Sequence, residues 1–263
     1  MIFYFSATGN SRFVAQTAAS LLGEKRLVDL RIFYQSQAER TSFPLAKGER
    51  IGFIFPTHAW GLPKGLGRIL SSLRFPGYDV NNYCYMICTC GDDVGETARL
   101  WRRAVKGAGL HGDAAFSVAM PNTYVCLPGF DVDDTQTATR KLENAPTAIQ
   151  GIIDKICAKS VGDFSFHGKF AFLKTRIIRP FFLRFLAREK ILSFHQEMCV
   201  ACKICAGTCP TGNISTTDGR PQWHARCIGC LACYHHCPAH AISCGRYAPF
   251  EKGQYLHPSL KRQ

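Results

Sequence analysis

Two copies of one cysteine motif, near the C-terminal end of the chain, constrain this protein more than any other feature. Residues 199–210 read CVACKICAGTCP and residues 227–238 read CIGCLACYHHCP, so both follow the pattern C-x2-C-x2-C-x3-C-P. Each cysteine of the second motif lies 28 positions after its counterpart in the first. Of the 14 cysteines in 263 residues, nine fall between Cys199 and Cys244. The segment is therefore an internal repeat of one metal-binding unit.

The spacing indicates how each motif would bind its metal. A short loop with three thiolates two residues apart can bind three corners of a [4Fe–4S] cubane, and the fourth cysteine then reaches the other cluster. The proline after the fourth cysteine needs no backbone donor. We therefore assign the ligands to two groups. The first cysteine set is Cys199, Cys202, Cys205 and Cys237, and the second cysteine set is Cys227, Cys230, Cys233 and Cys209.

Structural zinc is the alternative, but zinc sites use CxxC pairs separated by a longer gap, with four ligands per ion. Three cysteines at every third residue, followed by a fourth before proline, do not fit that pattern. The stretch resembles the bacterial-type two-cluster ferredoxins over about 50 residues. This resemblance implies a small α+β unit with pseudo-twofold symmetry, in which electrons pass between two neighbouring clusters.

The N-terminal part begins with a strand, a loop and a helix. The apolar run 2–5 predicts a buried strand, because aromatic and β-branched residues favour strands. Apolar residues at helical spacing follow from Phe13 to Leu22 and end at Gly23. The loop between them is Ser6-Ala7-Thr8-Gly9-Asn10-Ser11. Its backbone N–H groups, its hydroxyls and the helix dipole suit a phosphate, although it is neither G-x-G-x-x-G nor a P-loop.

Alternating strands and helices continue along the chain. Further strands are predicted at 26–30, 51–55, 82–89 and 114–120, and helices near 63–73, 95–108 and 136–158. This order predicts an α/β fold with a doubly wound, parallel, five-stranded sheet and helices on both faces. Ligands of such sheets bind beyond the carboxyl ends of the strands.

Three loops at strand ends should therefore converge on one site. The strand–S-x-T-G-N-S–helix arrangement resembles the FMN phosphate loop of flavodoxins; an ordinary capped turn is the alternative. The second loop is Pro56-Thr57-His58-Ala59-Trp60-Gly61. The resemblance makes Trp60 the candidate for stacking on the flavin ring, and Gly61 the candidate for a peptide that rearranges on flavin reduction. The third loop, expected on the pyrimidine side, is Thr89-Cys90-Gly91-Asp92.

Two features of this site have alternative interpretations. A carboxylate of Asp92 or Asp93 would repel the anion of a reduced flavin and lower its potential, or it would cap the following helix. Residues 120–124, after the fifth strand, would close over the cofactor or form a plain loop.

For the remaining cysteines and several histidines we expect mainly structural or surface roles. Cys84, Cys88 and Cys90 share parity on a strand, which predicts small core residues on one face, with a reactive Cys90 as the alternative. Three cysteines without metal spacing are expected to be structural: Cys126, Cys157 and Cys244. Three histidines are expected at the surface or as donors to cluster sulfurs: His224, His235 and His236.

As a whole, the chain resembles the flavodoxin–ferredoxin fusion proteins of anaerobic bacteria and archaea, over about residues 1–160 and 195–245. The resemblance implies FMN, two [4Fe–4S] clusters and electron transfer. Four segments are implied: a flavodoxin-like FMN domain at 1–160, a basic and aromatic connector at 161–195, a two-cluster ferredoxin domain at 196–246 and a C-terminal tail at 247–263.

The connector is strongly basic. Between Phe164 and His195, seven Lys and Arg residues oppose only Glu189, and Pro180 suits the first turn of a helix. The connector either packs between the domains with its arginines extended outward, or forms a basic docking surface for an acidic partner or an interfacial helix on a membrane.

The net charge and the hydropathy of the chain limit which binding partners and which cellular compartment we expect. The formal net charge of +13 favours an acidic redox protein partner, and no nucleic-acid recognition motif is found. No run of 18 uncharged apolar residues occurs, so no transmembrane segment is expected. The N-terminus lacks the basic region of a signal peptide. We expect a cytoplasmic protein whose cysteines are metal ligands or redox groups rather than disulfides.

These features predict an electron-transfer iron–sulfur flavoprotein that passes electrons between FMN and two [4Fe–4S] clusters, linking a low-potential donor to a partner acceptor. One alternative is an FMN-dependent reductase of a small organic substrate, fed by the clusters. Another is a non-catalytic, cluster-bearing subunit of a larger complex. The sequence shows no paired acid–base residues at the flavin loops and no nicotinamide fingerprint, which favours electron transfer.

Overall fold

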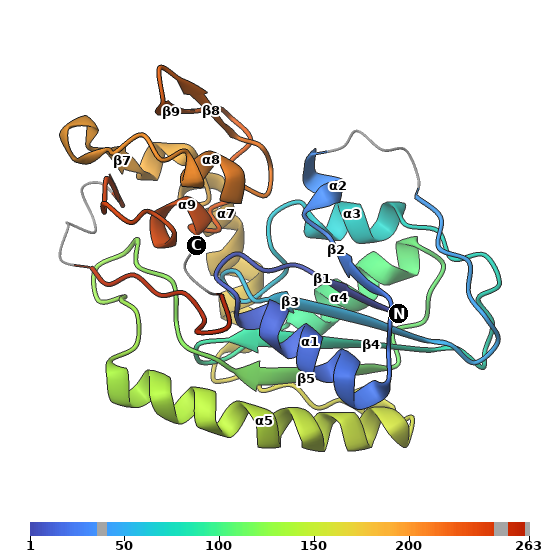
Figure 1. Ribbon diagram of the computed structural model, residues 1–263. Coiled ribbons are helices and arrows are strands. Elements are labelled where there is room, and N and C mark those ends of the chain that lie inside the picture. Colours follow the sequence, from blue (N-terminus) through green and yellow to red (C-terminus); the bar gives the residue numbers. More distant parts are fainter. Residues whose placement is uncertain (36–40, 245–251, 261–263) are drawn as a thin grey trace.

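A parallel sheet forms the centre of the computed structural model, which describes residues 1–35, 41–244 and 252–260 (Figure 1). Its strand order is β2-β1-β3-β4-β5-β6. The strands are β1 (Ile2–Tyr4), β2 (Leu27–Asp29), β3 (Arg50–Pro56), β4 (Tyr83–Cys90), β5 (Ala114–Ala119) and β6 (Gly162–Asp163). The first five are the strands predicted from the sequence, so the parallel α/β sheet is confirmed.

The prediction of a five-stranded sheet was wrong by one strand. Strand β6 pairs in parallel with β5 through Gly162 and Asp163, within the range assigned to the connector. Glycine and aspartate are poor strand formers, so no local pattern indicated this strand. The sheet and its helices are called the sheet unit below.

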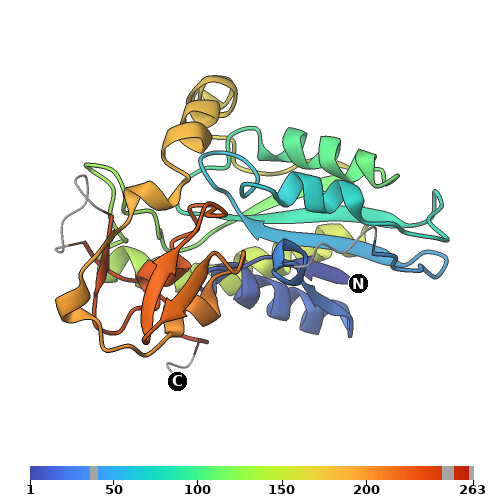
Figure 2. The same ribbon diagram turned by 90° about the horizontal axis from the view of Figure 1, so that it is seen from above.

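Helices cover both faces of the sheet (Figures 1 and 2). The helices of this unit are α1 (Asn10–Leu22), α2 (Ile32–Gln35), α3 (Leu66–Ser72), α4 (Thr97–Gly107) and α5 (Thr135–Cys157). Helices α1 and α5 bury one apolar cluster against the sheet, and α3 and α4 bury another around Trp101. The doubly wound arrangement is therefore confirmed.

The cysteine motifs lie in a small unit with a repeated backbone. Its elements are β7 (Ser193–Phe194), η3 (Gln196–Met198), α8 (Ile204–Thr208), β8 (Ile214–Thr217), β9 (Arg220–Trp223), α9 (Ala232–His235) and β10 (Ile242–Ser243). Antiparallel pairs form between β7 and β10 and between β8 and β9. Lys203 and Leu231, which precede α8 and α9, have φ values of 60° and 59°. Because these residues are 28 positions apart, the sequence repeat is also a repeat of backbone conformation.

A helical connector joins the two units. It consists of α6 (Ala171–Leu173), the π-helical turn η1 (Lys174–Ile178) and α7 (Arg179–Phe185), followed by the 3-10 turn η2 (Glu189–Ile191). Pro180 lies in the first turn of α7, as predicted, but helical geometry begins earlier, at Ala171. Proline has no N–H to continue an α-helical ladder, which accounts for the irregular turn before it. No helix among the described residues is long and apolar enough to cross a membrane.

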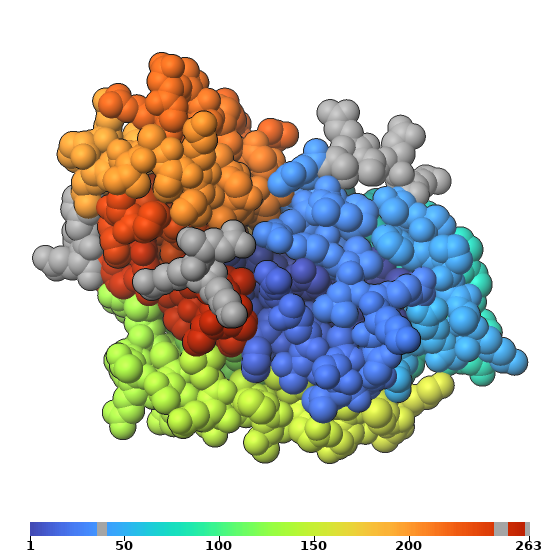
Figure 3. Space-filling view, viewed as in Figure 1, coloured from blue at the N-terminus to red at the C-terminus, as the bar shows by residue number. Residues whose placement is uncertain are grey.

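A C-terminal segment returns to the start of the chain. Residues 252–260, red in Figure 3, pack against the blue N-terminal helix α1. The Tyr255 hydroxyl donates to Asn10 Oδ1 at 2.9 Å, and the backbone N–H of His257 donates to the Thr8 carbonyl at 2.8 Å. The two ends of the chain therefore stabilise the first loop together. Part of the predicted tail, residues 247–251 and 261–263, lies outside the described residues.

Candidate functional site

A cavity of about 230 Å³ lies beyond the carboxyl ends of β1, β3 and β4. Fourteen of the sixteen residues predicted to contact a cofactor line it: Ser6, Ala7, Thr8, Asn10, Ser11, Pro56, Thr57, His58, Ala59, Trp60, Thr89, Cys90, Gly91 and Asp92. Residues 120–124 also line it. The three predicted loops thus converge, and the fourth segment forms part of the wall.

The first loop has the geometry of an anion site. Gly9 adopts φ 100° immediately before α1, and within the described residues no side chain caps the first N–H groups of that helix. The Ser11 hydroxyl lies 2.7 Å from the Thr89 hydroxyl, and the Asn10 amide donates to the Pro121 carbonyl at 2.9 Å. These contacts fix the loop while leaving the backbone donors at the helix N-terminus free for a phosphate.

Two predicted contact residues face away from the cavity. A Cβ on Gly9 would lie 2.7 Å from atoms of His257 and Leu260, in the C-terminal segment. A Cβ on Gly61 would collide with the Arg179 guanidinium. Both glycines therefore allow another segment to pack closely behind a loop.

The Trp60 loop is a tight turn held from behind by the connector. Ala59 and Trp60 have φ values of 47° and 57°, and the His58 N–H donates to the Gly61 carbonyl at 2.8 Å. The Thr175 hydroxyl donates to the Trp60 carbonyl and accepts from the Glu96 N–H, both at 2.9 Å. Two consecutive left-handed residues other than glycine are costly, so this support maintains the turn.

The two aspartates of the third loop have different surroundings. Asp93 is buried and its Oδ2 lies 2.5 Å from Lys174 Nζ. Asp92 is exposed at the rim of the cavity. Neither caps the next helix, since the residue before α4 is Glu96 and Asp93 Oδ1 accepts from the Gly95 N–H. The interpretation of these aspartates as helix caps was therefore wrong. Lys174 pairs with Asp93, so Asp92 is the carboxylate at the cavity that Lys174 does not neutralise.

The cysteines of β4 are core residues, as predicted. Cys84, Cys88 and Cys90 are buried in the same apolar cluster. Burial, together with the charges of Asp93 and Asp92, raises the pKa of Cys90 to about 12. Its thiol therefore stays protonated at neutral pH, which disfavours the reactive alternative.

One orphaned polar atom faces the same region. The Tyr124 hydroxyl is buried and, within the described part of the chain, has no hydrogen-bond partner. Tyr124 lines the cavity. Since buried hydroxyls are normally paired, this atom suits a ligand with a polar edge.

The eight motif cysteines lie around two small cavities, four around each. All four members of the first set line one small cavity, and all four members of the second set line another. Burial, together with the charges of the other three members of the first set, raises the pKa of Cys205 to about 11. Four thiolates cannot collect at such a site without positive charge, which iron ions supply.

Backbone donors point at the cysteine sulfurs in a repeated pattern. The Asn213 N–H donates to Cys209 Sγ and the Ala241 N–H donates to Cys237 Sγ, both at 3.3 Å. Such donors stabilise cluster thiolates and tune their potential. In the described ranges no three Cys, His, Asp or Glu side chains lie close enough to hold one metal ion, whereas a cubane binds each thiolate at a separate iron.

The comparisons with known proteins concern the same segment. A family model described as a 4Fe–4S binding domain matches residues 192–215 and 223–243. Residues 192–243 are a 4Fe–4S ferredoxin-type domain. No curated protein matches the sequence. The family match supports the binding of 4Fe–4S clusters by this domain.

The second cysteine set lies beside the cavity of the sheet unit. Gly229, Cys230 and Leu231 line both that cavity and the small cavity of the second set. Lys64, from the sheet unit, donates to the Cys227 carbonyl at 3.1 Å and to the Ala187 carbonyl at 3.0 Å. The ferredoxin-type domain therefore presents its second set, rather than its first, to the sheet unit.

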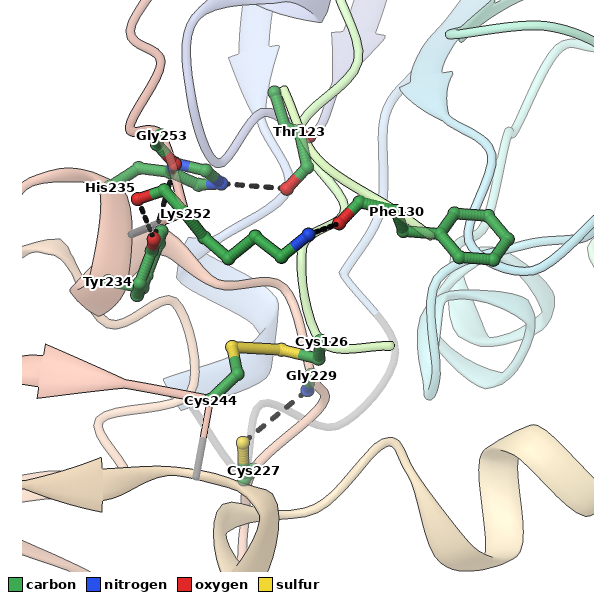
Figure 4. Close-up of a disulfide and its surroundings, with 10 residues drawn as sticks. All are labelled: Thr123, Cys126, Phe130, Cys227, Gly229, Tyr234, His235, Cys244, Lys252 and Gly253. Carbon is green, nitrogen blue, oxygen red and sulfur yellow. Dashed lines mark hydrogen bonds between the residues drawn. A yellow bond between two sulfur atoms is a disulfide. The ribbon is translucent and has the colours of Figure 1, made fainter. Parts of the chain in front are cut away.

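His235 corrects one expectation. It is buried, and neither of its nitrogens bonds to a cluster cysteine: Nδ1 accepts from the Tyr255 N–H at 3.2 Å and Nε2 donates to the Thr123 carbonyl at 2.7 Å. His224 is a surface residue, as expected, and bonds to Ser215. His235 instead joins the ferredoxin-type domain to the 120–124 loop (Figure 4).

A disulfide lies close to this contact. Cys126 and Cys244 are bonded, with their Cα atoms 5.1 Å apart and a sequence separation of 118 positions (Figure 4). The pair departs from the expectation that cysteines here avoid disulfides. It ties the loop after β5 to the residue that follows β10, a pairing that the spacing did not indicate.

Proposed function

We propose that this protein is an electron-transfer iron–sulfur flavoprotein. FMN binds in the cavity of the sheet unit, and each cysteine set holds one [4Fe–4S] cluster. FMN exchanges one or two electrons and a cluster exchanges one, so together they connect two-electron and one-electron carriers.

The observation that carries this proposal is the shared wall between the two sites. Cys230 lines the cavity of the three loops and the small cavity of the second cysteine set. A cofactor in the first cavity and a cluster in the second would be separated by one loop of the chain. A ferredoxin-type domain that served only as an independent carrier would not need this placement.

Several features support FMN as the occupant. The strand order 2-1-3-4-5, followed here by β6, is that of flavodoxin-like sheets, which bind FMN where the strand order reverses. The uncapped start of α1 suits the phosphate, and Trp60 lies in the cavity wall where it can stack on the ring. Lys174 neutralises Asp93, so Asp92 is the carboxylate that would disfavour a reduced, anionic flavin.

The first cysteine set forms the outer end of the proposed relay. Cys202 is exposed and the neighbouring Val200 is 66% exposed. We propose that an acidic redox protein exchanges electrons here, since the chain has a formal net charge of +13.

A flavin titration tests the proposal. Adding FMN to the anaerobic, iron-loaded protein should quench flavin fluorescence at a one-to-one ratio. Trp60→Ala should weaken binding by roughly tenfold to a hundredfold, because stacking of a heteroaromatic base on an aromatic side chain contributes about 1–3 kcal/mol. Trp60→Phe, which keeps an aromatic ring, should bind nearly as well as the parent. Binding unchanged in Trp60→Ala would rule out the stacking role, and no binding at all would rule out FMN.

A further inference from the structure

The connector helix, residues 171–185, is amphipathic, but its polar face lies against the protein and its apolar face is exposed. Four of its five polar side chains contact the sheet unit. Thr175 is buried against the Trp60 loop, Lys174 pairs with Asp93, and Arg176 donates to both oxygens of Glu96 at 2.7 and 3.1 Å. An ordinary surface helix buries its apolar face instead.

The apolar face points outward. One stripe at helical spacing consists of Phe170, Leu173, Ile177, Phe181 and Phe185, which are 73%, 43%, 59%, 61% and 49% exposed. Neighbouring Phe166 and Phe172 are 64% and 57% exposed. The helix stands out from the body of the molecule in Figure 2. A contiguous apolar surface of this kind marks an interaction site.

Cations surround this stripe. From Phe164 to Arg188 the sequence has six Lys and Arg residues and no Asp or Glu. Lys169 precedes the helix, Arg184 lies in its last turn, Arg188 follows it, and all three are exposed. The Arg176 and Arg184 guanidinium groups lie over the Phe172 and Phe185 rings, at 4.5 and 5.6 Å from the ring centroids.

We propose that this face binds the surface of an anionic lipid bilayer. The stripe would enter the region between headgroups and acyl chains, and the flanking cations would contact lipid phosphates. An outward apolar face rich in Phe, Leu and Ile beside Lys and Arg is the composition of an interfacial helix. The membrane would hold the protein at its surface through this one helix.

The shape and charge favour lipid over a protein partner. The stripe is a projecting ridge, and a protein would need a matching groove to cover it, whereas a bilayer accepts any ridge. An acidic protein would satisfy the cations but not five outward apolar side chains in one row. The outer cysteine set, with Cys202 and Val200 exposed, remains a separate surface for a redox partner.

Vesicle flotation tests the proposal with the complete, iron-loaded protein. Vesicles of phosphatidylcholine alone are compared with vesicles of phosphatidylcholine and phosphatidylglycerol in about equal amounts. We expect binding to the anionic vesicles, at least tenfold weaker binding to the neutral ones, and weakening as salt rises. Equal binding to both compositions, or none to either, would overturn the proposal.

Matched variants distinguish binding through the stripe from nonspecific adsorption through other exposed apolar side chains. Leu173→Ser with Ile177→Ser should lower binding to anionic vesicles by tenfold or more. Leu21→Ser with Val80→Ser removes two other exposed apolar side chains, 45% and 98% exposed, and should leave binding unchanged. Iron content and the far-ultraviolet circular dichroism spectrum should match the parent in both pairs.

The same variants also test whether a second copy of the chain, rather than a lipid bilayer, covers the stripe. If the parent protein is a dimer that Leu173→Ser with Ile177→Ser converts to a monomer, a second copy covers the stripe and the lipid proposal fails. If the stripe variant floats as well as the parent, the helix does not bind the membrane. Flotation needs no electron transfer, so these outcomes are independent of the proposed redox function.

Discussion

Single side chains connect the two units of this protein. Lys64 bonds to the carbonyl of Cys227, within the second cysteine set, although it belongs to the loop before α3. His257 covers the first loop from outside and stacks on Phe13 with ring centroids 4.4 Å apart. These residues contact parts of the chain that are distant in sequence, so replacing each one should change a specific, measurable property.

Replacing Lys64 should change the second cluster more than the first. Lys64→Met removes a positive charge beside Cys227, so we expect the reduction potential of the second cluster to fall by tens of millivolts. A redox titration followed by EPR measures it. Lys159→Met is the matched control, because Lys159 also donates to a carbonyl, that of Asn81, at the opposite edge of the sheet. Equal shifts in both variants would contradict the role of Lys64.

Replacing one cysteine should remove one cluster. Cys202→Ser deletes an exposed member of the first set, so iron content should fall by about half and the ferredoxin-type domain should lose stability. Iron analysis after anaerobic reconstitution checks this. Cys157→Ser, at the exposed end of α5, should retain all the iron. Full iron in Cys202→Ser would disprove the assignment of the first set.

Acid should loosen the C-terminal segment through His257. Burial lowers its pKa from 6.5 to about 4. As pH falls, the unfolded state therefore binds a proton before the folded state does, and stability is lost between about pH 6.5 and pH 4. We expect a loss of roughly 1–2 kcal/mol from this residue between pH 7 and pH 5. Denaturant unfolding of parent and His257→Asn at both values measures it; an identical loss in both would exclude His257 as the cause.

At the scale of elements, the connector supports the proposed flavin site rather than merely joining two domains. Its buried Thr175 links the Trp60 carbonyl to the start of α4, and Arg179 donates to the Leu62 carbonyl from α7. Both sides of the Trp60 loop are therefore held by one helical segment.

Thr175→Val should weaken this support. The isosteric change removes the donor to the Trp60 carbonyl and leaves the Glu96 N–H without its acceptor, at a cost of about 1–3 kcal/mol. We expect a lower unfolding temperature and weaker FMN binding. Thr139→Val, at an exposed position of α5, is the control for the loss of a hydroxyl. If FMN affinity is unchanged in Thr175→Val, the connector does not position the Trp60 loop.

Local patterns predicted the elements and the loops well, because strand–helix alternation and cysteine spacing are properties of short segments. The sixth strand escaped prediction, since Gly162 and Asp163 pair only because β5 lies beside them. The role of His235 and the Cys126–Cys244 bond also depend on contacts across more than 100 residues. Such contacts leave no local signal in one sequence.

At the scale of the whole molecule, the placement of the second cysteine set defines an order of the three proposed cofactor sites. The cavity of the sheet unit shares lining residues with the cavity of the second set and none with that of the first set, which includes the exposed Cys202. The C-terminal segment and the Lys64 and His235 contacts hold the two units in this order. A relay from flavin to partner is therefore consistent with the architecture.

The central claim is that one chain holds FMN and two [4Fe–4S] clusters. An anaerobic redox titration of the reconstituted protein, followed by visible and EPR spectra, counts the cofactors directly. The account predicts one flavin and two [4Fe–4S] centres per chain, all of which titrate reversibly. Two clusters with no flavin, after reconstitution with excess FMN, would contradict it.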